Sequence, residues 1–226
     1  MITRLKRNLR SMCAIGCMTV VSLPNAVSAA PILDPLKDYK DRTDQNVTMD
    51  LNSDGKPDYV LLIKKPPVEG HTHYDLMVFM SGAEGYVEAL AIPSFWDSWG
   101  ESDDNRLKPT LELSTMPAPK GSTLVIKVTD HSDDGANQQL KFRWENNDFR
   151  LIGETKSASP RGSVISDTGE ELPGRWSRSK DINWLTGKML VHCDLKAKKK
   201  SGFVKPNYIS IKKYDLSADY LDDVCK

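Results

Sequence analysis

Alternation of hydrophobic and polar residues dominates the chain, and it predicts strands rather than helices. The clearest case is the segment 138–145, where Leu140, Phe142 and Trp144 alternate with Gln, Lys, Arg and Glu residues. A period of two places one set of side chains on a buried face and the other set in water. Similar short runs bounded by turn residues recur along the chain. The predicted strands are 47–50, 59–64, 74–80, 86–92, 111–114, 123–129, 138–145, 149–153, 188–195 and 208–214.

Turn residues join several of these strands into hairpins. Ser-Gly-Ala-Glu-Gly at 81–85 separates two strands, and Asn-Asn-Asp at 146–148 separates another two. Both sequences are typical of tight reversals. The basic run at 196–200 is expected to form the turn of a third hairpin, between 188–195 and 208–214. Its lysines are expected mainly to keep the turn soluble.

Helical patterns are confined to the two ends of the chain. A short helix is expected at 34–42, with Pro35 in its first turn, and a closing helix after Ser217. The fold class that follows is mainly β. We expect a single domain of antiparallel hairpins, sandwich-like or an open curved sheet, with a short C-terminal helix.

Two long polar stretches, 94–108 and 156–180, interrupt the strand pattern. Connections of this length inside a compact domain are usually functional or disordered. The first holds Phe95, Trp96 and Trp99, and the second holds Trp176. Because tryptophan is enriched among the residues that dominate protein interfaces, all four are candidates for contacting a partner. The alternative for the cluster at 95–99 is that it closes one end of a β core.

Oxygen-bearing side chains surround one glycine in the segment 50–58. Asp50, Asn52, Asp54 and Asp58 stand at positions 1, 3, 5 and 9, with Gly55 between them and Lys56 at position 7. Ca²⁺ takes roughly six to eight oxygen ligands, and such a loop supplies side chains plus one carbonyl. A helix-loop-helix site would need Glu at position 12, where an apolar strand begins instead. The alternative is a turn rich in Asn and Asp.

Asp-Leu-Asn-x-Asp-Gly-Lys-x-Asp followed directly by an apolar strand resembles the calcium loops of FG-GAP repeats, which are also called VCBS or integrin-alpha-like repeats. Such repeats are common in exported bacterial proteins. The resemblance implies that Asp50, Asn52, Asp54 and Asp58 are side-chain ligands of Ca²⁺ and that Lys56 offers its carbonyl oxygen. These repeats usually form β-propellers in arrays. Since the motif occurs once here, at most a partial propeller-like arrangement is expected.

The first 29 residues have the composition of an export signal. Four basic residues precede an apolar stretch from Met12 to Leu23, and Val27, Ser28 and Ala29 fit a small-residue cleavage site. The apolar stretch is shorter than the roughly 18 residues of a membrane span, so we expect no integral membrane segment after cleavage. We expect cleavage after Ala29, a single domain at 30–226 and a periplasmic location.

Charge and cysteine content narrow the function classes. The signal carries four of the 31 Lys and Arg and no acidic residue, so the mature chain has a net charge of −4. That balance gives no reason to expect nucleic acid as a partner. Cys13 and Cys17 leave with the signal. The remaining pair, Cys193 and Cys225, is expected to form a disulfide, because an even pair in an exported chain usually does.

Motifs for catalysis are weak. Ser-x-x-Lys occurs three times, at 53–56, 177–180 and 210–213, without the companion motifs of serine acyl transferases. His71 and His73 could offer two imidazoles to zinc, with His131 or His192 as a third, or simply lie in a polar loop. No catalytic residue is assigned. The sequence favours a periplasmic, calcium-stabilised binding module for a protein partner, of inhibitor or immunity type. The alternative is a periplasmic hydrolase whose active site the sequence does not reveal.

Overall fold

The computed structural model describes residues 34–69, 71–98, 109–119, 121–131, 135–159, 164–165, 168–169, 171–172, 177–193, 198–214 and 216. The described residues form two main antiparallel sheets. The small sheet has the order β1 (Thr43–Met49), β2 (Asp58–Lys64), β3 (Thr72–Ser81) and β4 (Tyr86–Ser98). The mainly-β fold class is therefore confirmed, with open sheets rather than a closed barrel.

The large sheet has seven strands. In spatial order they are β13 (Lys198–Phe203), β12 (Lys188–Cys193), β11 (Arg178–Asn183), β8 (Asp148–Ala158), β7 (Asn137–Glu145), β6 (Ser122–Thr129) and β5 (Thr110–Pro117). Two further strands of two residues, β9 (Val164–Ile165) and β10 (Glu171–Leu172), pair with each other. The described residues also include the helix α1 (Pro35–Asp38) and the 3-10 turn η2 (Ile211–Lys213).

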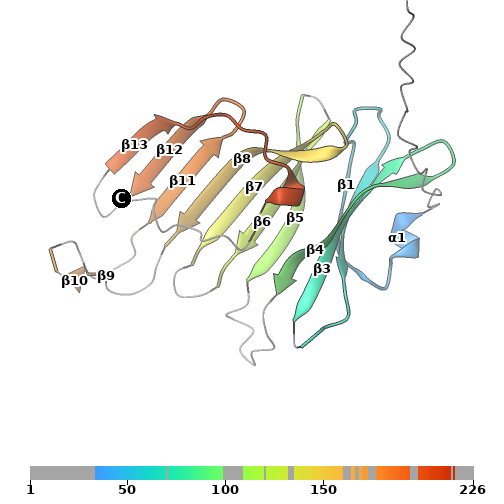
Figure 1. Ribbon diagram of the computed structural model, residues 1–226, viewed down its shortest axis with the longest axis horizontal. Coiled ribbons are helices and arrows are strands. Elements are labelled where there is room, and N and C mark those ends of the chain that lie inside the picture. The colour runs from blue at the N-terminus through green and yellow to red at the C-terminus, as the bar shows by residue number, and fades with distance from the viewer. Residues whose placement is uncertain are drawn as a thin grey trace, which may run out of the picture.

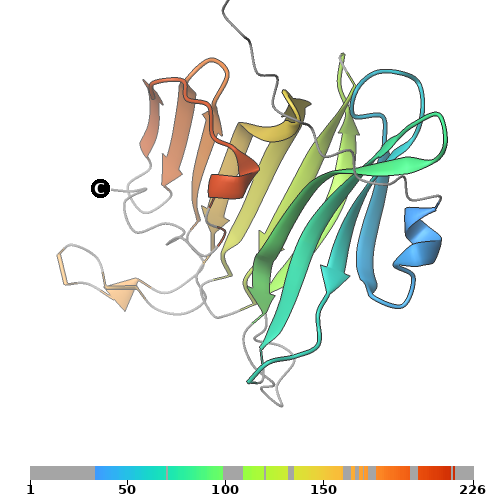
Figure 2. The ribbon, with the colours of Figure 1, turned by 45° about the vertical axis from the view of Figure 1, so that its right-hand side comes forward.

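The two sheets are unequal in width. Figures 1 and 2 show the small sheet facing the β5–β7 end of the large sheet, while β11, β12 and β13 extend away from it. The main core lies between the facing parts of the sheets, and eighteen buried residues form it. They include Val60, Leu62, Leu76 and Val78 of the small sheet and Leu124, Ile126, Leu140, Phe142, Phe149 and Leu151 of the large sheet. Burying these side chains is the main favourable term in folding.

The strand β7 shows how the sequence pattern determines this arrangement. Leu140 and Phe142 are fully buried, and Trp144 packs against the core, whereas the residues between them are partly exposed. The predicted period-two alternation at 138–145 is therefore confirmed. The predicted reversal that follows is also present: Asn146 and Asn147 both have positive φ, 54° and 58°, and Glu145 pairs with Asp148. Two consecutive positive φ values are typical of the tight turn that suits twisted hairpins.

One glutamine side chain joins the two sheets at the edge where β1 approaches β5. The amide nitrogen of Gln45 donates to the carbonyl oxygen of Leu111 (2.5 Å), and its oxygen accepts from the amide of Leu113 (2.8 Å). The side-chain amide of Gln45 thus bonds to β5 much as the backbone of a neighbouring strand would. These two bonds close one corner of the sandwich.

Strand predictions near the C-terminus were partly wrong. The partner of β12 is β13, which contains Lys198, Lys199 and Lys200 of the basic run that was expected to form a turn. The segment 208–214 holds a single bridge at Ser210 and the turn η2 instead of a strand. After β13 the chain crosses the β11–β12 turn, where the amide of Val204 donates to the carbonyl of Gly187 (2.8 Å). This crossing directs 208–214 to the start of β8, where the Leu151 amide donates to the Ile209 carbonyl.

Other boundaries differ from the predictions. The stretch expected as a polar loop from residue 94 begins inside β4, and the loop expected at 156–180 is shortened at both ends by β8 and β11. The first helix spans four residues rather than nine, with the side chain of Asp34 accepting from the amide of Lys37 at its start. The predicted closing helix after Ser217 lies outside the described residues.

A polar network lies under the C-terminal segment, on the inner face of the large sheet. Gln138 donates to the hydroxyl of Tyr214 (2.6 Å), and that hydroxyl donates to Glu154 (2.9 Å). The indole of Trp184 (3.2 Å) and the ammonium of Lys156 (3.1 Å) also contact the Glu154 carboxylate. Gln138 and Glu154 are 1% and 9% exposed, so their polar groups depend on these partners.

We predict that Tyr214→Phe destabilises the protein by about 1–3 kcal/mol, because it leaves a buried amide and a buried carboxylate each short of one hydrogen bond. Tyr208→Phe is the matched control, since Tyr208 is 45% exposed. It should change the free energy of unfolding by less than about 0.5 kcal/mol. Urea denaturation measures both. Equal effects of the two variants would show that the network contributes nothing specific.

Candidate calcium site and the surface beside it

The segment 50–58 links β1 to β2 and is folded around its own side chains. The Oδ1 of Asp50 accepts from the amide of Asp54 (3.1 Å), and its Oδ2 accepts from the amide of Gly55 (3.0 Å). The Oδ1 of Asn52 accepts from the same Asp54 amide (3.0 Å). Asp54 in turn accepts from the amide of Lys56 (2.8 Å) and from the side-chain nitrogen of Asn52 (3.1 Å). Three of the four predicted side-chain ligands therefore converge within one loop.

Asp58 differs from the other acidic residues of the loop because it is fully buried, at 0% exposed. Its Oδ2 accepts from the amide of Leu51, and its Oδ1 accepts from the amide of Ser81, both at 2.8 Å. A buried carboxylate is costly unless such hydrogen bonds compensate it, and bonds to an ionised acceptor are among the stronger ones. Asp58 thereby holds the start of the loop against the end of β3.

The loop also contacts the large sheet. Gly121, in the β5–β6 turn, has a φ of +72°, and a Cβ there would lie 2.9 Å from the carbonyl oxygen of Asp50 and 3.1 Å from that of Leu51. Only glycine allows this approach without displacing the loop backbone. Within the loop, Ser53 and Gly55 take positive φ values of 63° and 81°, which turn the backbone around the polar side chains. The loop is thus fixed to both sheets.

The donor chemistry of the loop fits calcium, which prefers carboxylate, amide and carbonyl oxygens. Each carboxylate oxygen that accepts one amide keeps a further lone pair for an ion. In the described part of the chain, no three His, Cys, Asp or Glu side chains are already arranged as a metal cluster. Calcium would use the remaining lone pairs of these oxygens, so the hydrogen bonds inside the loop would be kept. The residues that would hold it are the predicted ones: Asp50, Asn52, Asp54, Asp58 and the carbonyl of Lys56.

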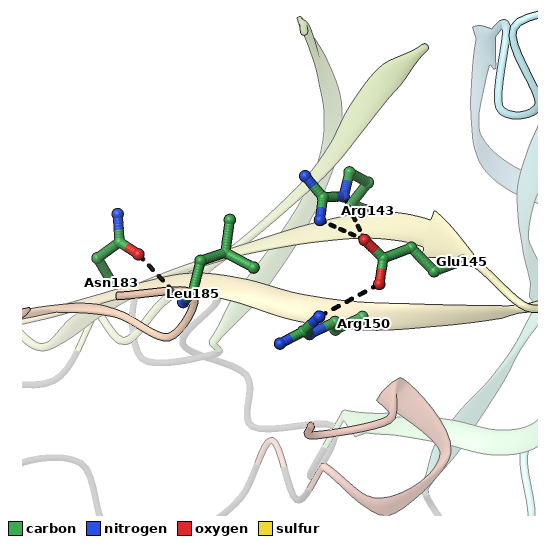
Figure 3. A network of polar contacts seen from close by, with 5 residues as sticks. All are labelled: Arg143, Glu145, Arg150, Asn183 and Leu185. Carbon is green, nitrogen blue, oxygen red and sulfur yellow. Dashed lines mark hydrogen bonds and ion pairs between the residues drawn. The ribbon is translucent and has the colours of Figure 1, made fainter. Parts of the chain in front are cut away.

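An arginine cluster lies at the β7–β8 hairpin, next to the loop. Figure 3 shows Glu145 between Arg143 and Arg150. The Nε of Arg143 donates to Glu145 (2.6 Å), and a terminal nitrogen of Arg150 lies 3.4 Å from the other oxygen of Glu145. Burial by itself would raise the pKa of the Glu145 carboxyl, but the hydrogen bonds and charges of Arg143 and Arg150 hold that pKa below its usual value. Two guanidinium groups share one carboxylate, so the cluster is net positive.

A cleft of about 670 Å³ separates this cluster from the loop. Its walls are residues 51–53 of the loop, Ala118 and Pro119 of the β5–β6 turn, and residues 143–147 of the β7–β8 hairpin. The cleft therefore lies between the polar loop 50–58 and the net-positive cluster of Arg143, Glu145 and Arg150. The sequence did not identify it, because its walls come from three separate turns.

The predicted partner-binding aromatic residues are placed differently from one another. Phe95 and Trp96 belong to β4 and pack, partly buried, against the main core. The ring of Trp96 lies 5.3 Å from that of Tyr74. These two residues therefore occupy the positions expected if they close an end of the core. Trp99 and Trp176 lie outside the described residues.

Two further candidates from the sequence can be placed in part. The Nδ1 atoms of His71 and His73 each lie 3.6 Å from an oxygen of Asp97, a neighbour that the sequence did not indicate. Cys193 is buried at the end of β12, at 5% exposed, whereas Cys225 lies outside the described residues. The disulfide between them stays a prediction.

Searches of protein-family models, of curated proteins and of solved structures gave no match to the chain. The resemblance to calcium-loop repeats therefore depends on the residues of the loop itself. Among the residues that the structure describes, no helix is both long enough and apolar enough to span a membrane.

We predict that Asp58→Asn destabilises the protein by about 1–3 kcal/mol even when a chelator removes all calcium, because one of the two buried amides then faces an NH₂ group. Asp54→Asn is the control in the same loop. Its side chain is exposed, and the new amide oxygen can still accept from Lys56, so a change below about 0.5 kcal/mol is expected. Denaturant titration in EGTA compares them. A smaller effect for Asp58 than for Asp54 would contradict the assigned role of Asp58.

Proposed function

We propose that the chain is an exported β-domain that calcium stabilises and that works as a protein-binding module in the periplasm, of inhibitor or immunity type. The observation that carries the proposal is the anchoring of the loop 50–58. Its oxygen donors converge, Asp58 bonds it to β3, and Gly121 of the large sheet touches its backbone. An ion bound there would act on the framework of the whole domain.

Repulsion between the carboxylates of the loop would favour calcium binding. Asp50, Asp54 and Asp58 put three carboxylates within nine residues, and like charges this close repel one another. The amides of the loop offset part of that repulsion, and a divalent cation would offset more. When bound, the ion would supply positive charge and oxygen coordination. The loop residues would keep the register of β1 against β2, where Met49 pairs with Asp58.

The binding role is supported by the setting and by the architecture. The predicted signal would direct the chain out of the cytoplasm. Outside the cytoplasm, small and firmly folded domains often act on other proteins. The sandwich offers a rigid framework, and its long connections at 99–108 and 160–176 contain Trp99 and Trp176. Trp96, which was also predicted to contact a partner, packs partly buried against the core.

We predict that calcium raises the melting temperature of the mature protein. At a free calcium concentration 100 times the dissociation constant, mass action adds about 2.7 kcal/mol of stability, which corresponds to roughly 5–10 °C for a chain of this size. Asp54→Ala should lose this shift, and Asp41→Ala, at an exposed position in the turn after α1, should keep it. Differential scanning calorimetry in EGTA and in calcium measures the difference. An identical calcium response in wild type and Asp54→Ala would refute the site.

We predict that the immobilised mature protein retains a specific periplasmic protein, which mass spectrometry identifies. The variant Trp99→Ala, Trp176→Ala should retain less of it while melting at the wild-type temperature, since interface tryptophans often carry much of the binding energy. A purified toxin or cell-wall hydrolase, if retained, should lose activity when the chain is added. Failure to retain any protein, combined with hydrolysis by the chain itself that one polar substitution abolishes, would establish the hydrolase alternative instead.

A further inference from the structure

Exposed apolar side chains gather on the outer face of the large sheet, at its β11–β13 end. Phe203 is 78% exposed, Leu190 50% and Leu185 37%, and they are three of the six large hydrophobic side chains that are exposed among the described residues. All three line one open groove of about 590 Å³, together with Ile152 and the lysines described below. Contiguous exposed apolar surface of this kind often marks an interaction site.

The strand register explains why these side chains lie together. Phe203 pairs with Lys188 across β13 and β12, and Leu190 pairs with Ser201 on one side and with Asp181 on the other. Directly opposed residues of an antiparallel pair point to the same face, so these pairs form adjacent rows on one face. Gly153, which pairs with Lys141 and Asn183 on this face, adds no side chain and leaves a hollow there.

The groove is a permanent feature of the fold rather than a gap between separate elements. Every residue that lines it belongs to the large sheet or to the turn between β11 and β12. The end of β13 is fixed by the hydrogen bond between the amide of Val204 and the carbonyl of Gly187. A Cβ at Gly187 would overlap the carbonyl oxygen of Val204, so the two segments are in close contact. The backbone at Phe203 is therefore held in place, which reduces the entropy that is lost on binding.

Positive charge surrounds the apolar floor. Lys141 and Lys188 line the groove, and no ion pair of either is found in the described part of the chain. The carboxylate of Asp181 accepts a hydrogen bond from the hydroxyl of Thr155 (2.7 Å). Further along the outer face of β7, Arg143 follows Lys141 by two residues and belongs to the net-positive cluster with Arg150. The ligand that complements this surface combines apolar bulk with negative charge.

The carboxylate of Asp181 offsets one of the two lysines, whereas the second carboxylate that lines the groove, that of Glu154, does not face it. The Glu154 side chain turns to the inner face, where Tyr214, Trp184 and Lys156 contact it. Two copies of the chain meeting groove to groove would oppose their lysines, which disfavours self-association through this face. The outer edge of β13 carries a run of lysines, a feature that discourages strand addition, so contact through the groove is favoured over contact through the edge.

We propose that this groove is the docking site for an acidic segment of the partner protein that carries a large apolar side chain. The apolar side chain would lie against Phe203, Leu190 and Leu185, and carboxylates beside it would face Lys141 and Lys188. The inference rests on the proposed function as a binding module and specifies the surface and the chemistry of its partner. It moves the main contact away from the aromatic residues of β4, which the core partly buries.

A random library of 12-residue peptides, displayed on phage and panned on the folded mature protein, tests the chemistry directly. We expect enrichment of peptides with Phe, Leu or Trp flanked by Asp and Glu. The best peptide should bind at least about tenfold more weakly to Phe203→Ser and to Lys141→Glu, Lys188→Glu. The matched controls are Val68→Ser, at an apolar site that is 58% exposed away from the groove, and Lys40→Glu, Lys64→Glu. Both controls should bind like wild type.

Other outcomes would overturn the assignment. Enriched peptides that are basic, or that bind Phe203→Ser and the controls equally, would show that the groove is not the site. Dimers seen by sedimentation that Phe203→Ser abolishes would make a second copy the occupant. Binding to phosphatidylglycerol vesicles that Phe203→Ser abolishes would make a lipid surface the occupant. If the wild type retains a periplasmic partner and Phe203→Ser retains it equally, only the docking assignment fails; if wild type retains none, the proposed function fails.

Discussion

The buried carboxylate of Asp58 is the interaction on which the arrangement of the small sheet and the loop depends. It begins β2, it accepts the amide that opens the loop, and it accepts the amide that ends β3. Because it is fully buried, its two oxygens need the hydrogen bonds from these amides, or its desolvation would count against the fold. The two hydrogen bonds of Asp58 therefore fix the distance between the loop 50–58 and the end of β3. Once the loop is fixed there, Gly121 can pack against its backbone and bring the large sheet into place.

The unequal width of the two sheets explains the polar network on the inner face of the large sheet and the apolar groove on its outer face. Where the sheets face each other, apolar side chains fill the space between them. Beyond the small sheet, the inner face of the large sheet is covered by the segment 208–214, and hydrogen bonds through Tyr214 connect Gln138 to Glu154. Among the described residues, no such cover lies over the groove on the outer face at β11–β13, which is lined by the large sheet and the β11–β12 turn. The part of the large sheet that extends beyond the small sheet thus has a covered inner face and an apolar outer face.

The sequence predicted the features that depend on local pattern and missed those that depend on distant neighbours. The alternation at Leu140 and Phe142 and the Asn146-Asn147 turn appear as predicted, and the loop around Gly55 has the predicted convergence of oxygen donors. A strand was predicted at 208–214, but the crossing at Gly187 leads this segment to the start of β8, where Ile211 is buried within a 3-10 turn. The exposure of Leu190 and Phe203 could not be predicted, because alternation alone does not tell which face of a sheet another layer covers.

Amide hydrogen exchange measured by NMR, with and without calcium, tests the central claim most directly. The claim is that calcium binds the loop 50–58 and strengthens its attachment to the rest of the domain. Calcium should slow the exchange of the amides that bond to the loop carboxylates, those of Leu51, Asp54 and Gly55, and also that of Ser81, which lies in another strand but bonds to Asp58. Unchanged exchange at all four amides in saturating calcium would contradict the account.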